Sequence, residues 1–448
     1  MCNTSLATEF FTKSQKRVFA KNSGREPNEA QAILHVPRQI FEKNSKLKTT
    51  YIEIPQVSQT NEVFLCKPFH IWGAEMGVNE FGVTIGYEAI FSNLKIPKKN
   101  IGLTGMDLLR LALERTSSAR QALFLITELL ESYGQVAYGS YANRPFFYNS
   151  SFIIADRTDG YLLETADKFW VAKKISDFCA ITNHLTIDSD FDFSSKSLEN
   201  KLLNTNDFSF KRTFSNSFCT YINGSKERRK LNIKMANTSI AKHNSYTAME
   251  SIQNLKTHSI SEDEFEPCNS NMKSLCLHAK GLTTPIQTNG SLVVEWDISE
   301  LNPDPIRIFY TGTSSPCLSV FKPFYFGTKN LVEQSSLLPN QNYSETLWWL
   351  HESINRRANY DYQSVRSVLL PTMIGLQESI FSNYKESLSL QKKEETQWKF
   401  LKDHVNLLKT TYSELNLHKL GVSRLQNPFF HMYWKNQNKN LNLPGFNE

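Results

Sequence analysis

The sequence predicts an α+β fold, with a mixed domain over roughly residues 1–330 and a helical C-terminal region over 331–448. Three observations support this prediction. Apolar residues recur at helical spacing over 104–132, whereas over 151–175 they alternate at the spacing of a β-strand. The chain beyond 330 is charged and amphipathic, which is typical of helices that face solvent on one side. Strands and helices in separate runs are typical of the α+β class.

The N-terminal part of the chain carries several short strand signals separated by turn residues. The first expected strand runs into a turn at 23–27, which contains Gly24 and Pro27, and a second turn is expected at 79–82. The expected strands of this part are 17–22, 50–54, 62–67 and 83–86.

The helical period over 104–132 predicts two consecutive helices. Thr104 is a suitable N-cap for the first helix, because its hydroxyl can accept a backbone N–H of the first turn. Ser117 or Ser118 can cap the second helix in the same way, and Gly134 closes it.

The alternating segment predicts three antiparallel strands. Residues 151–155 and 161–164 form a hairpin around the turn at 156–160, and 169–174 adds a third strand. Residues 187–270 are polar and weakly periodic, which predicts helices joined by long surface loops. Strands are expected again at 290–296, 307–311 and 321–326, and amphipathic helical stretches at 345–360 and 375–415.

Composition and charge exclude several classes of protein. The 448 residues are 40% hydrophobic, 12% aromatic and 21% charged, which is enough apolar material for a large core. The net charge of +6 is too small over this length to indicate a nucleic-acid or membrane partner. Residues 1–20 lack the apolar segment of a signal peptide, and no apolar run is long enough to cross a bilayer. We therefore expect a soluble, cytoplasmic protein.

The cysteines and histidines do not show the spacing of a metal site. No two of the seven cysteines have Cys-x-x-Cys spacing, so neither a zinc site nor a dense disulfide framework is expected. His70, His184 and His278 stand alone in the sequence, and Cys276 sits in an apolar run as a buried small hydrophobe would. No phosphate-binding glycine loop is present either. We expect no metal and no cofactor.

Cys2 is the most informative residue of the sequence. Methionine aminopeptidase removes an initiator methionine when the next side chain is small, so the mature chain is expected to begin with a free α-amine on a cysteine. An α-amine titrates at about 7.7–8.0 and a thiol at about 8.5. The amine can therefore accept the thiol proton near neutral pH and later deliver it to a leaving amine. A second-position cysteine with no role is the alternative interpretation.

Several segments, taken in order, carry a resemblance to one known family. Examples are Lys-Asn-Ser-Gly-Arg-Glu-Pro-Asn-Glu-Ala-Gln at 21–31 and Trp-Gly-Ala-Glu-Met-Gly-Val-Asn-Glu-Phe-Gly-Val at 72–83. The full set is 2–4, 19–31, 50–56, 72–83, 105–115, 149–157, 163–166, 275–279, 309–313, 319–324 and 347–352. The series resembles the secernin family, which is similar to the dipeptidase-A-type cysteine peptidases among the N-terminal-nucleophile (Ntn) hydrolases. The resemblance covers most of residues 1–326 and is poor between about 187 and 270.

The resemblance implies a fold, an activity and a set of site residues. The fold is a four-layer αββα sandwich, and the activity is hydrolysis of dipeptides or similar small amides without a cofactor. Cys2 matches the nucleophile, and Lys21 matches a cation that would favour the thiolate. Asn183 matches an oxyanion donor, and a late basic residue of the site would be Arg228 or Arg229.

Two positions depart from the family pattern. The family has Asp where this chain has Gly24, and in related enzymes that carboxylate holds the α-amine of the nucleophile. Tyr87 stands where many relatives have Asn, which leaves the second oxyanion donor open. Positioned acid–base catalysis contributes about 10²–10⁴-fold to a rate, so the loss at position 24 can slow the enzyme.

These observations leave three interpretations. The first is a cysteine-type dipeptidase that acts on small peptide or amide substrates, with a homo-oligomer as one expected assembly. The second is a scaffold that kept the fold, lost activity and now binds or regulates a partner, as Gly24 and the C-terminal helices suggest. The third is a penicillin- or bile-salt-type amidase of the same superfamily, which the motifs follow less closely.

Overall fold

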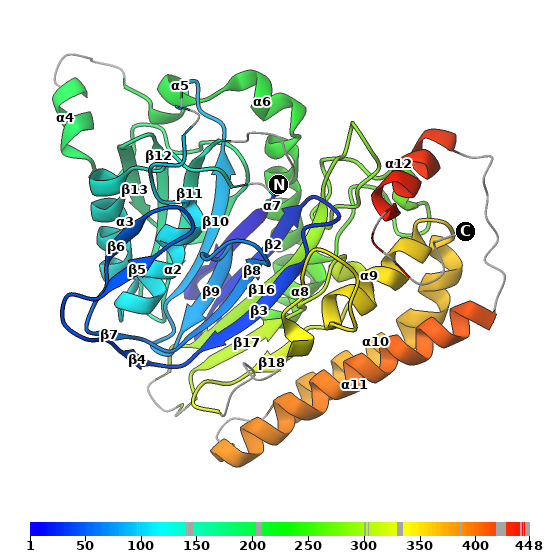
Figure 1. Cartoon of the computed structure of the whole chain (residues 1–448). Helices are drawn as coiled ribbons and strands as arrows, with labels where there is room; N and C mark the ends of the chain where they lie inside the picture. Colours follow the sequence, from blue (N-terminus) through cyan, green and yellow to red (C-terminus); the bar gives the residue numbers. More distant parts are fainter. Residues whose placement is uncertain are drawn as a thin grey trace.

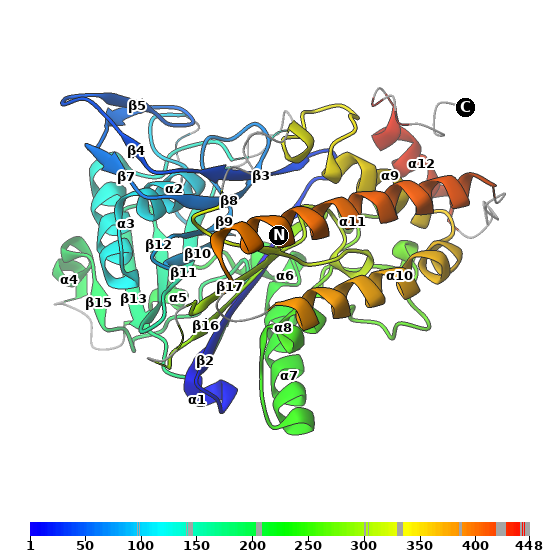
Figure 2. The same ribbon diagram turned by 90° about the horizontal axis from the view of Figure 1, so that it is seen from below.

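Two antiparallel β-sheets lie face to face between layers of helices (Figures 1 and 2). The computed structural model describes the chain except for residues 96, 98, 140, 142–146, 203–207, 300–301, 303, 329–334, 385–387, 418–426, 440, 442 and 444–448. Both views place α2 and α3 beside the larger sheet, and α10 and α11 on the opposite side of the molecule. The α+β class and the four-layer αββα arrangement that the sequence predicts are thereby confirmed.

The smaller sheet has six strands and contains the N-terminus of the chain. Its order is β14–β1–β2–β16–β17–β18, and every neighbouring pair is antiparallel. The strands are β1 (Asn3–Ala7), β2 (Lys16–Arg25), β14 (Phe178–Ile181), β16 (Gln287–Asp297), β17 (Ile306–Tyr310) and β18 (Lys322–Phe324).

The larger sheet has eight strands in the order β15–β13–β12–β11–β10–β9–β8–β3, again antiparallel throughout. Its strands are β3 (Gln31–Val36), β8 (Val63–Pro68), β9 (Met76–Asn79), β10 (Thr84–Ile90), β11 (Asn149–Ala155), β12 (Gly160–Ala166), β13 (Phe169–Lys174) and β15 (Phe193–Ser194). Two short ribbons lie outside both sheets: β4 (Gln39–Ile40) with β7 (Gln59–Thr60), and β5 (Lys46–Lys48) with β6 (Glu53–Pro55).

Alternation along the strands of the larger sheet produces two cores. Phe64 and Ile153 belong to the core shared with the six-stranded sheet, whereas Val63 and Ile154 pack on the other face with α2 (Gly105–Arg115) and α3 (Ala119–Tyr133). The two sheets pack closely at Gly86 of β10, where an added Cβ would lie 2.7 Å from the ring of Phe19 on β2. Only glycine allows this separation of the sheets.

The start signals of α2 and α3 act as the sequence predicts. Thr104 and Asp107 form a capping box at the start of α2, and Ser118 accepts the backbone N–H of Gln121 at the start of α3. Gly134 ends α3 with a φ of +69°. The hairpin of β11 and β12 and the third strand β13 are confirmed too.

The remaining helices are distributed between the two sheets: Lys196–Leu202 contacts β13 of the larger sheet, whereas Ser225–His243 and Ala248–Leu255 contact strands of the six-stranded sheet. They are α1 (Glu9–Thr12), α4 (Lys196–Leu202), α5 (Phe210–Phe214), α6 (Ser217–Ile222), α7 (Ser225–His243), α8 (Ala248–Leu255), α9 (Leu347–Ala358), α10 (Tyr362–Asn383), α11 (Leu390–Leu417) and α12 (Pro428–Asn438), with short 3₁₀ turns at Pro267–Asn269, Pro316–Leu318 and Ser335–Leu337. Ile354, Leu369 and Phe400 of the C-terminal helices share a hydrophobic core with the six-stranded sheet. The boundary at residue 330 stays a prediction.

Two local predictions were wrong. The turn expected at 23–27 begins later, because Ser23, Gly24 and Arg25 continue β2. The strand expected at 50–54 is instead the short β6, which starts at Glu53.

Among the described residues, no helix combines the length and apolar character needed to span a bilayer.

Candidate active site

The N-terminal strand lies inside the six-stranded sheet, one place from its edge. β1 begins directly after Cys2 and pairs with β14 on one side and β2 on the other. The register sets Asn3 opposite Asn22 and Thr4 opposite Lys21, so Cys2 lies beside Ser23 and Gly24. Figures 1 and 2 both show the N-terminus near the middle of the molecule.

The Cys2 thiol is buried at the wall of a cavity and has a polar neighbourhood. The backbone N–H of Gly24 donates to its Sγ at 3.3 Å, and the Ser23 hydroxyl lies 4.0 Å from the same atom. Ser23 in turn donates a short hydrogen bond to the buried carboxylate of Glu75. An amide donor at this distance stabilises a thiolate.

A buried ion pair lies near Cys2. The Lys21 ammonium is 3.3 Å from Glu88 Oε1 and donates to the backbone carbonyl of Tyr87 at 2.7 Å. Thr4 donates to the same Glu88 oxygen at 2.6 Å. Burial alone would lower the pKa of Lys21, but the negative charges of Cys2 and Glu88 outweigh it and raise that pKa above its ordinary value. Burial raises the pKa of Glu88.

Asn183 and Arg228 complete the polar surroundings of the N-terminus. Asn183 follows β14, and its Oδ1 accepts from the Cys2 backbone N–H at 3.1 Å and from Arg228 on α7 at 2.9 Å. Its amide nitrogen donates to the Ala89 carbonyl at 2.9 Å. Burial lowers the pKa of Arg228 to about 10, so the guanidinium is still a cation at neutral pH.

Arg228 rather than Arg229 reaches the site. Arg229 donates to the Ala180 carbonyl at 2.7 Å, whereas the Arg228 guanidinium also donates to the carbonyls of Asn223 and Met272. The four residues that the sequence singled out, Cys2, Lys21, Asn183 and Arg228, therefore surround one buried N-terminus.

Met1 occupies the space at Gly24 in this chain. The Met1 amine donates to the Gly24 carbonyl at 2.7 Å, and a Cβ added at position 24 would collide with the Met1 carbonyl oxygen. Burial lowers the pKa of the Met1 amine. A side chain at position 24 is thus incompatible with Met1 as placed here.

The cavity beside Cys2 has a volume of about 220 Å³. Its polar wall contains a chain of charges, since Arg25 lies 2.8 Å from Glu75 and 3.8 Å from Glu29. The lining consists of Met1, Cys2, Gly24, Arg25, Glu26, Glu29, Glu75, Tyr87, Ala89, Phe91, Tyr148, Asn183, Asn223, Pro285 and Ile286. Tyr87, at the second departure from the family pattern, therefore faces the same cavity as the thiol.

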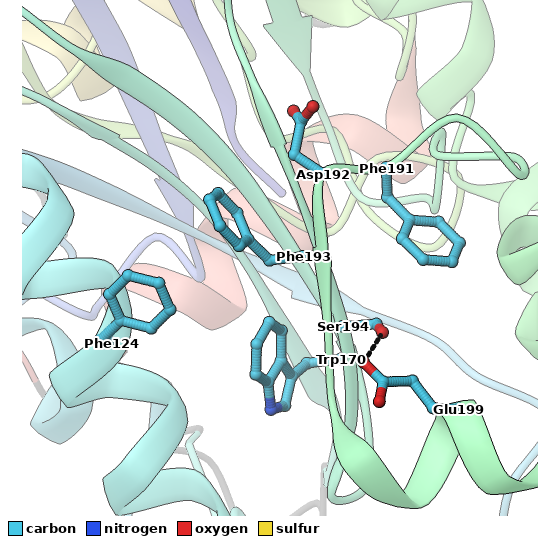
Figure 3. A pocket seen from close by; sticks show the side chains of 7 residues that line it. All are labelled: Phe124, Trp170, Phe191, Asp192, Phe193, Ser194 and Glu199. Carbon is cyan, nitrogen blue, oxygen red and sulfur yellow. Dashed lines mark hydrogen bonds between the residues drawn. The ribbon is translucent and has the colours of Figure 1, made fainter.

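A second, wider hollow of about 590 Å³ lies beside α3, β13 and β15. Figure 3 shows the aromatic rings of Phe124, Trp170 and Phe193 on one side of it, and the hydrogen bond of 3.0 Å between Ser194 and Glu199 on the other. Its described lining residues include no thiol, imidazole or cation. The Cys2 cavity is therefore the better candidate for covalent chemistry.

Sequence reasoning missed three groups at the site: Glu88, Ser23 and Glu75. A lone acid inside the apolar strand β10 was a usable signal for Glu88, because a buried carboxylate needs a partner.

The expectation that Cys276 is merely a small hydrophobe and that His278 is isolated was also incomplete. The structure brings the two side chains to 3.5 Å, within a cluster distant in sequence from Cys2.

Residues 41–277 match the family described as acyl-coenzyme A:6-aminopenicillanic acid acyl-transferase, and this match spans more than half of the 448 residues. The chain belongs to that acyl-transferase family. Together with the four-layer sandwich, membership places it among the Ntn hydrolases. Asn183 and Arg228 lie within the matched segment, whereas Cys2 and Lys21 precede it.

Solved structures similar to this acyl-transferase family member include a hydrolase, an acylase and an amidase. The C2A mutant of conjugated bile acid hydrolase from Clostridium perfringens is 14% identical, with 77% of this chain and 98% of that chain covered and a TM-score of 0.39. Penicillin V acylase from Agrobacterium tumefaciens is 11% identical, with coverages of 69% and 82% and a TM-score of 0.36. The Caenorhabditis elegans ortholog of N-acylethanolamine-hydrolyzing acid amidase is 11% identical, with coverages of 68% and 95% and a TM-score of 0.33.

Proposed function

We propose that the chain is a cysteine-dependent Ntn hydrolase of the secernin type, which cleaves dipeptides or similar small amides through an acyl-enzyme on Cys2. One observation carries the proposal: the Cys2 thiol faces a cavity, accepts the Gly24 N–H at 3.3 Å and lies beside the buried cations Lys21 and Arg228. These are the surroundings of an activated nucleophile.

Removal of Met1 would turn the Cys2 backbone nitrogen into a free α-amine. This amine takes the thiol proton, and the thiolate attacks the substrate carbonyl carbon, so that a new S–C bond forms. The scissile C–N bond then breaks, and the ammonium returns its proton to the departing amine. Water attacks the thioester, gives up one proton to the α-amine and releases the carboxylic acid, which restores the thiol.

The neighbouring residues have separate roles in this scheme. Lys21 stabilises the thiolate, while Asn183 Oδ1, held by Arg228, positions the Cys2 nitrogen. The Asn183 amide nitrogen carries two hydrogens and gives one to Ala89, so the second can serve the oxyanion. Burial raises the pKa of Tyr87 well above its ordinary value, so its phenol stays protonated and can be the second donor.

Other groups can replace the carboxylate that Gly24 does not provide. The Gly24 carbonyl already accepts from the Met1 amine at 2.7 Å and would be available to the Cys2 amine after processing. Ser23, bonded to Glu75 and 4.0 Å from the thiol, brings a carboxylate's charge close to the same point. These groups favour a working enzyme over the inactive scaffold.

The cavity favours a small substrate. Its volume of about 220 Å³ is below the range of about 300–1,000 Å³ typical of drug-sized ligands. Met1 is part of the lining, so its removal enlarges the space. The carboxylates of Glu29 and Glu75 suit the free ammonium of a dipeptide, while Phe91 and Ile286 suit an apolar side chain.

A second candidate is an amidase for larger N-acyl substrates, as the match to the acyl-transferase family over 41–277 suggests.

We place either activity in the cytoplasm, where thiols stay reduced, because all seven cysteines are unpaired.

Intact mass and limited alkylation test the proposal together. We expect the purified chain to lack Met1 and a substoichiometric amount of iodoacetamide near pH 7 to label Cys2 before the other cysteines. A panel of dipeptides and N-acyl amides should then show hydrolysis that Cys2→Ala abolishes and the control Cys179→Ala preserves. Retention of Met1, or turnover that survives Cys2→Ala, would refute the mechanism, and turnover of N-acyl amides alone would select the second candidate.

A further inference from the structure

Four potential metal ligands gather at a point that the active site does not use. They are His258, Cys276, His278 and Cys317, and their ligand atoms all lie within 4.8 Å of one another. His258 follows α8, Cys276 and His278 lie in the segment before β16, and Cys317 lies in the 3₁₀ turn Pro316–Leu318. His258, Cys276 and His278 are buried, and Cys317 is half-buried.

The spacing of these atoms matches a tetrahedral zinc centre. With Zn–N of about 2.0–2.1 Å and Zn–S of about 2.3 Å, tetrahedral angles require N···N of about 3.3 Å and N···S of about 3.6 Å. The two histidine Nε2 atoms are 3.3 Å apart. His278 Nε2 lies 3.5 Å from the Cys276 sulfur and 3.3 Å from the Cys317 sulfur.

Hydrogen bonds alone do not account for this arrangement. His278 Nε2 can either donate one hydrogen or accept one, yet three polar atoms converge on it within 3.5 Å. A neutral imidazole nitrogen can therefore form a hydrogen bond with only one of these three atoms at a time. A cation at the centre would bond to all four ligand atoms at once.

The surroundings are those of a metal site. Glu262 Oε1 lies 2.8 Å from His258 Nδ1, the ring nitrogen that points away from the cluster, and so fixes the tautomer in which Nε2 can bind a metal. The Tyr362 hydroxyl donates to the Cys317 sulfur at 3.8 Å. The ring of Phe265 stacks on His258 with the centroids 3.5 Å apart and excludes water from that side.

We propose that His258, Cys276, His278 and Cys317 form a structural zinc site. Two thiolates with two imidazoles are a donor set that Zn²⁺ prefers, and four protein ligands leave no position for substrate. Within the described residues, this is the one group of three or more candidate ligands that the structure brings together.

The site would connect loops that hold the N-terminal strands. Asn22 on β2 donates to the carbonyls of Leu255 and Leu275 at 2.8 and 2.9 Å, and Asn3 on β1 donates to Leu275 at 3.3 Å. Leu275 directly precedes Cys276, and Leu255 lies three residues before His258. A metal that fixes both loops therefore also fixes the carbonyls to which the strands beside Cys2 are bonded.

Metal analysis of the untagged full-length protein tests the proposal. We expect about one zinc per chain after purification without chelator, and a melting temperature that falls when a chelator removes it. Cobalt added to the metal-free protein should give the intense visible bands of tetrahedral Co²⁺ and a thiolate-to-cobalt charge-transfer band. Absence of zinc together with absence of this spectrum would overturn the proposal, and so would a Cys276–Cys317 disulfide in protein kept under reducing conditions.

Variants separate the site from a general loss of folding. Cys317→Ser should weaken cobalt binding by at least about tenfold, whereas the control Cys219→Ser, on α6, should leave both spectrum and zinc content unchanged. Cys317→His keeps four ligands but only one thiolate, so it should retain metal with a charge-transfer band of about half the intensity. Full zinc content in both Cys276→Ser and Cys317→Ser would rule out these ligands.

Discussion

The Lys21 ammonium and the Glu88 carboxylate form an ion pair of 3.3 Å in which both side chains are fully buried. Lys21 comes from β2 and Glu88 from β10, so the pair joins the two sheets near Cys2. Removing two charges from water costs several kcal/mol per ion, and their attraction offsets this only with good hydrogen bonds. Those bonds come from Thr4 and the Tyr87 carbonyl.

Glu88→Gln should destabilise the protein by about 3–5 kcal/mol, because it leaves the Lys21 charge buried without its counter-ion. Urea unfolding measures this change. The double variant Lys21→Met/Glu88→Gln removes both charges and should recover part of the loss. Equal stability of the single variant and the parent would show that the pair is not formed.

The same pair is expected to control the reactivity of the Cys2 thiol. Lys21→Met removes the cation whose pKa Cys2 and Glu88 hold above its ordinary value, so the thiolate loses a favourable interaction. Alkylation of processed Cys2 at pH 7 should slow by about tenfold or more. Exposed Lys13→Met, near the start of β2, is the matched control. Unchanged alkylation in Lys21→Met would remove Lys21 from the mechanism.

Arg228→Lys should reduce hydrolysis although it keeps the charge. The Arg228 guanidinium serves the Asn183 side chain and the Asn223 and Met272 carbonyls together, and an ammonium cannot reproduce this geometry. We expect kcat to fall by about 10²-fold while KM changes less, because the positioning of the Cys2 nitrogen is lost. The neighbour variant Arg229→Lys is the control. A loss confined to KM would indicate a substrate contact instead.

Chemical reasoning and the family resemblance predicted more residues of the candidate site than hydrophobic periodicity did. Cys2 followed from the chemistry of a thiol beside an α-amine, whereas Lys21 and Asn183 needed the resemblance. The strand β1 was not predicted at all, because Asn3, Thr4 and Ser5 are polar yet fully buried and show no alternation. The side chains of Asn3 and Thr4 hydrogen-bond inside the protein, which local sequence does not reveal.

The ligand cluster was missed for a different reason. His258 and Cys317 are 59 residues apart in the sequence, so a search for short-range ligand spacing passes over them. Only the fold brings the loop after α8 and the turn at Pro316–Leu318 to the segment before β16. The hairpin of β11 and β12 and the helices α2 and α3, in contrast, depend on local caps and alternation, and these were predicted correctly.

Gly24→Asp should lower the stability of the chain while Met1 is present and raise kcat once Met1 has been removed. While Met1 is present, the new side chain collides with the Met1 carbonyl, so the unprocessed chain should lose about 1–3 kcal/mol of stability. Once Met1 is gone, the carboxylate can hold the Cys2 amine and should raise kcat. Gly24→Ala shares the collision without the carboxylate and is the control. Equal rates for both processed variants would show that the groups already present suffice.

Acid should destabilise the fold through His184, which lies next to Asn183. Burial, reinforced by the positive charges of Arg229 and Arg228, lowers the pKa of His184 to about 3, against 6.5 in the unfolded chain. Between these values the unfolded state binds a proton that the folded state does not, so stability rises with pH and is lost as pH falls from 6.5 towards 3. The slope for one proton is about 1.4 kcal/mol per pH unit. The variant His184→Asn keeps an amide that can replace Nδ1 beside Thr182. It should reduce the slope of the unfolding free energy against pH, between pH 6 and 4.5, by the amount that corresponds to about one proton. The control His243→Asn, at an exposed position, should leave this slope unchanged. An unchanged slope in His184→Asn would show that another group, such as His70, whose pKa is also lowered by burial, dominates the acid transition.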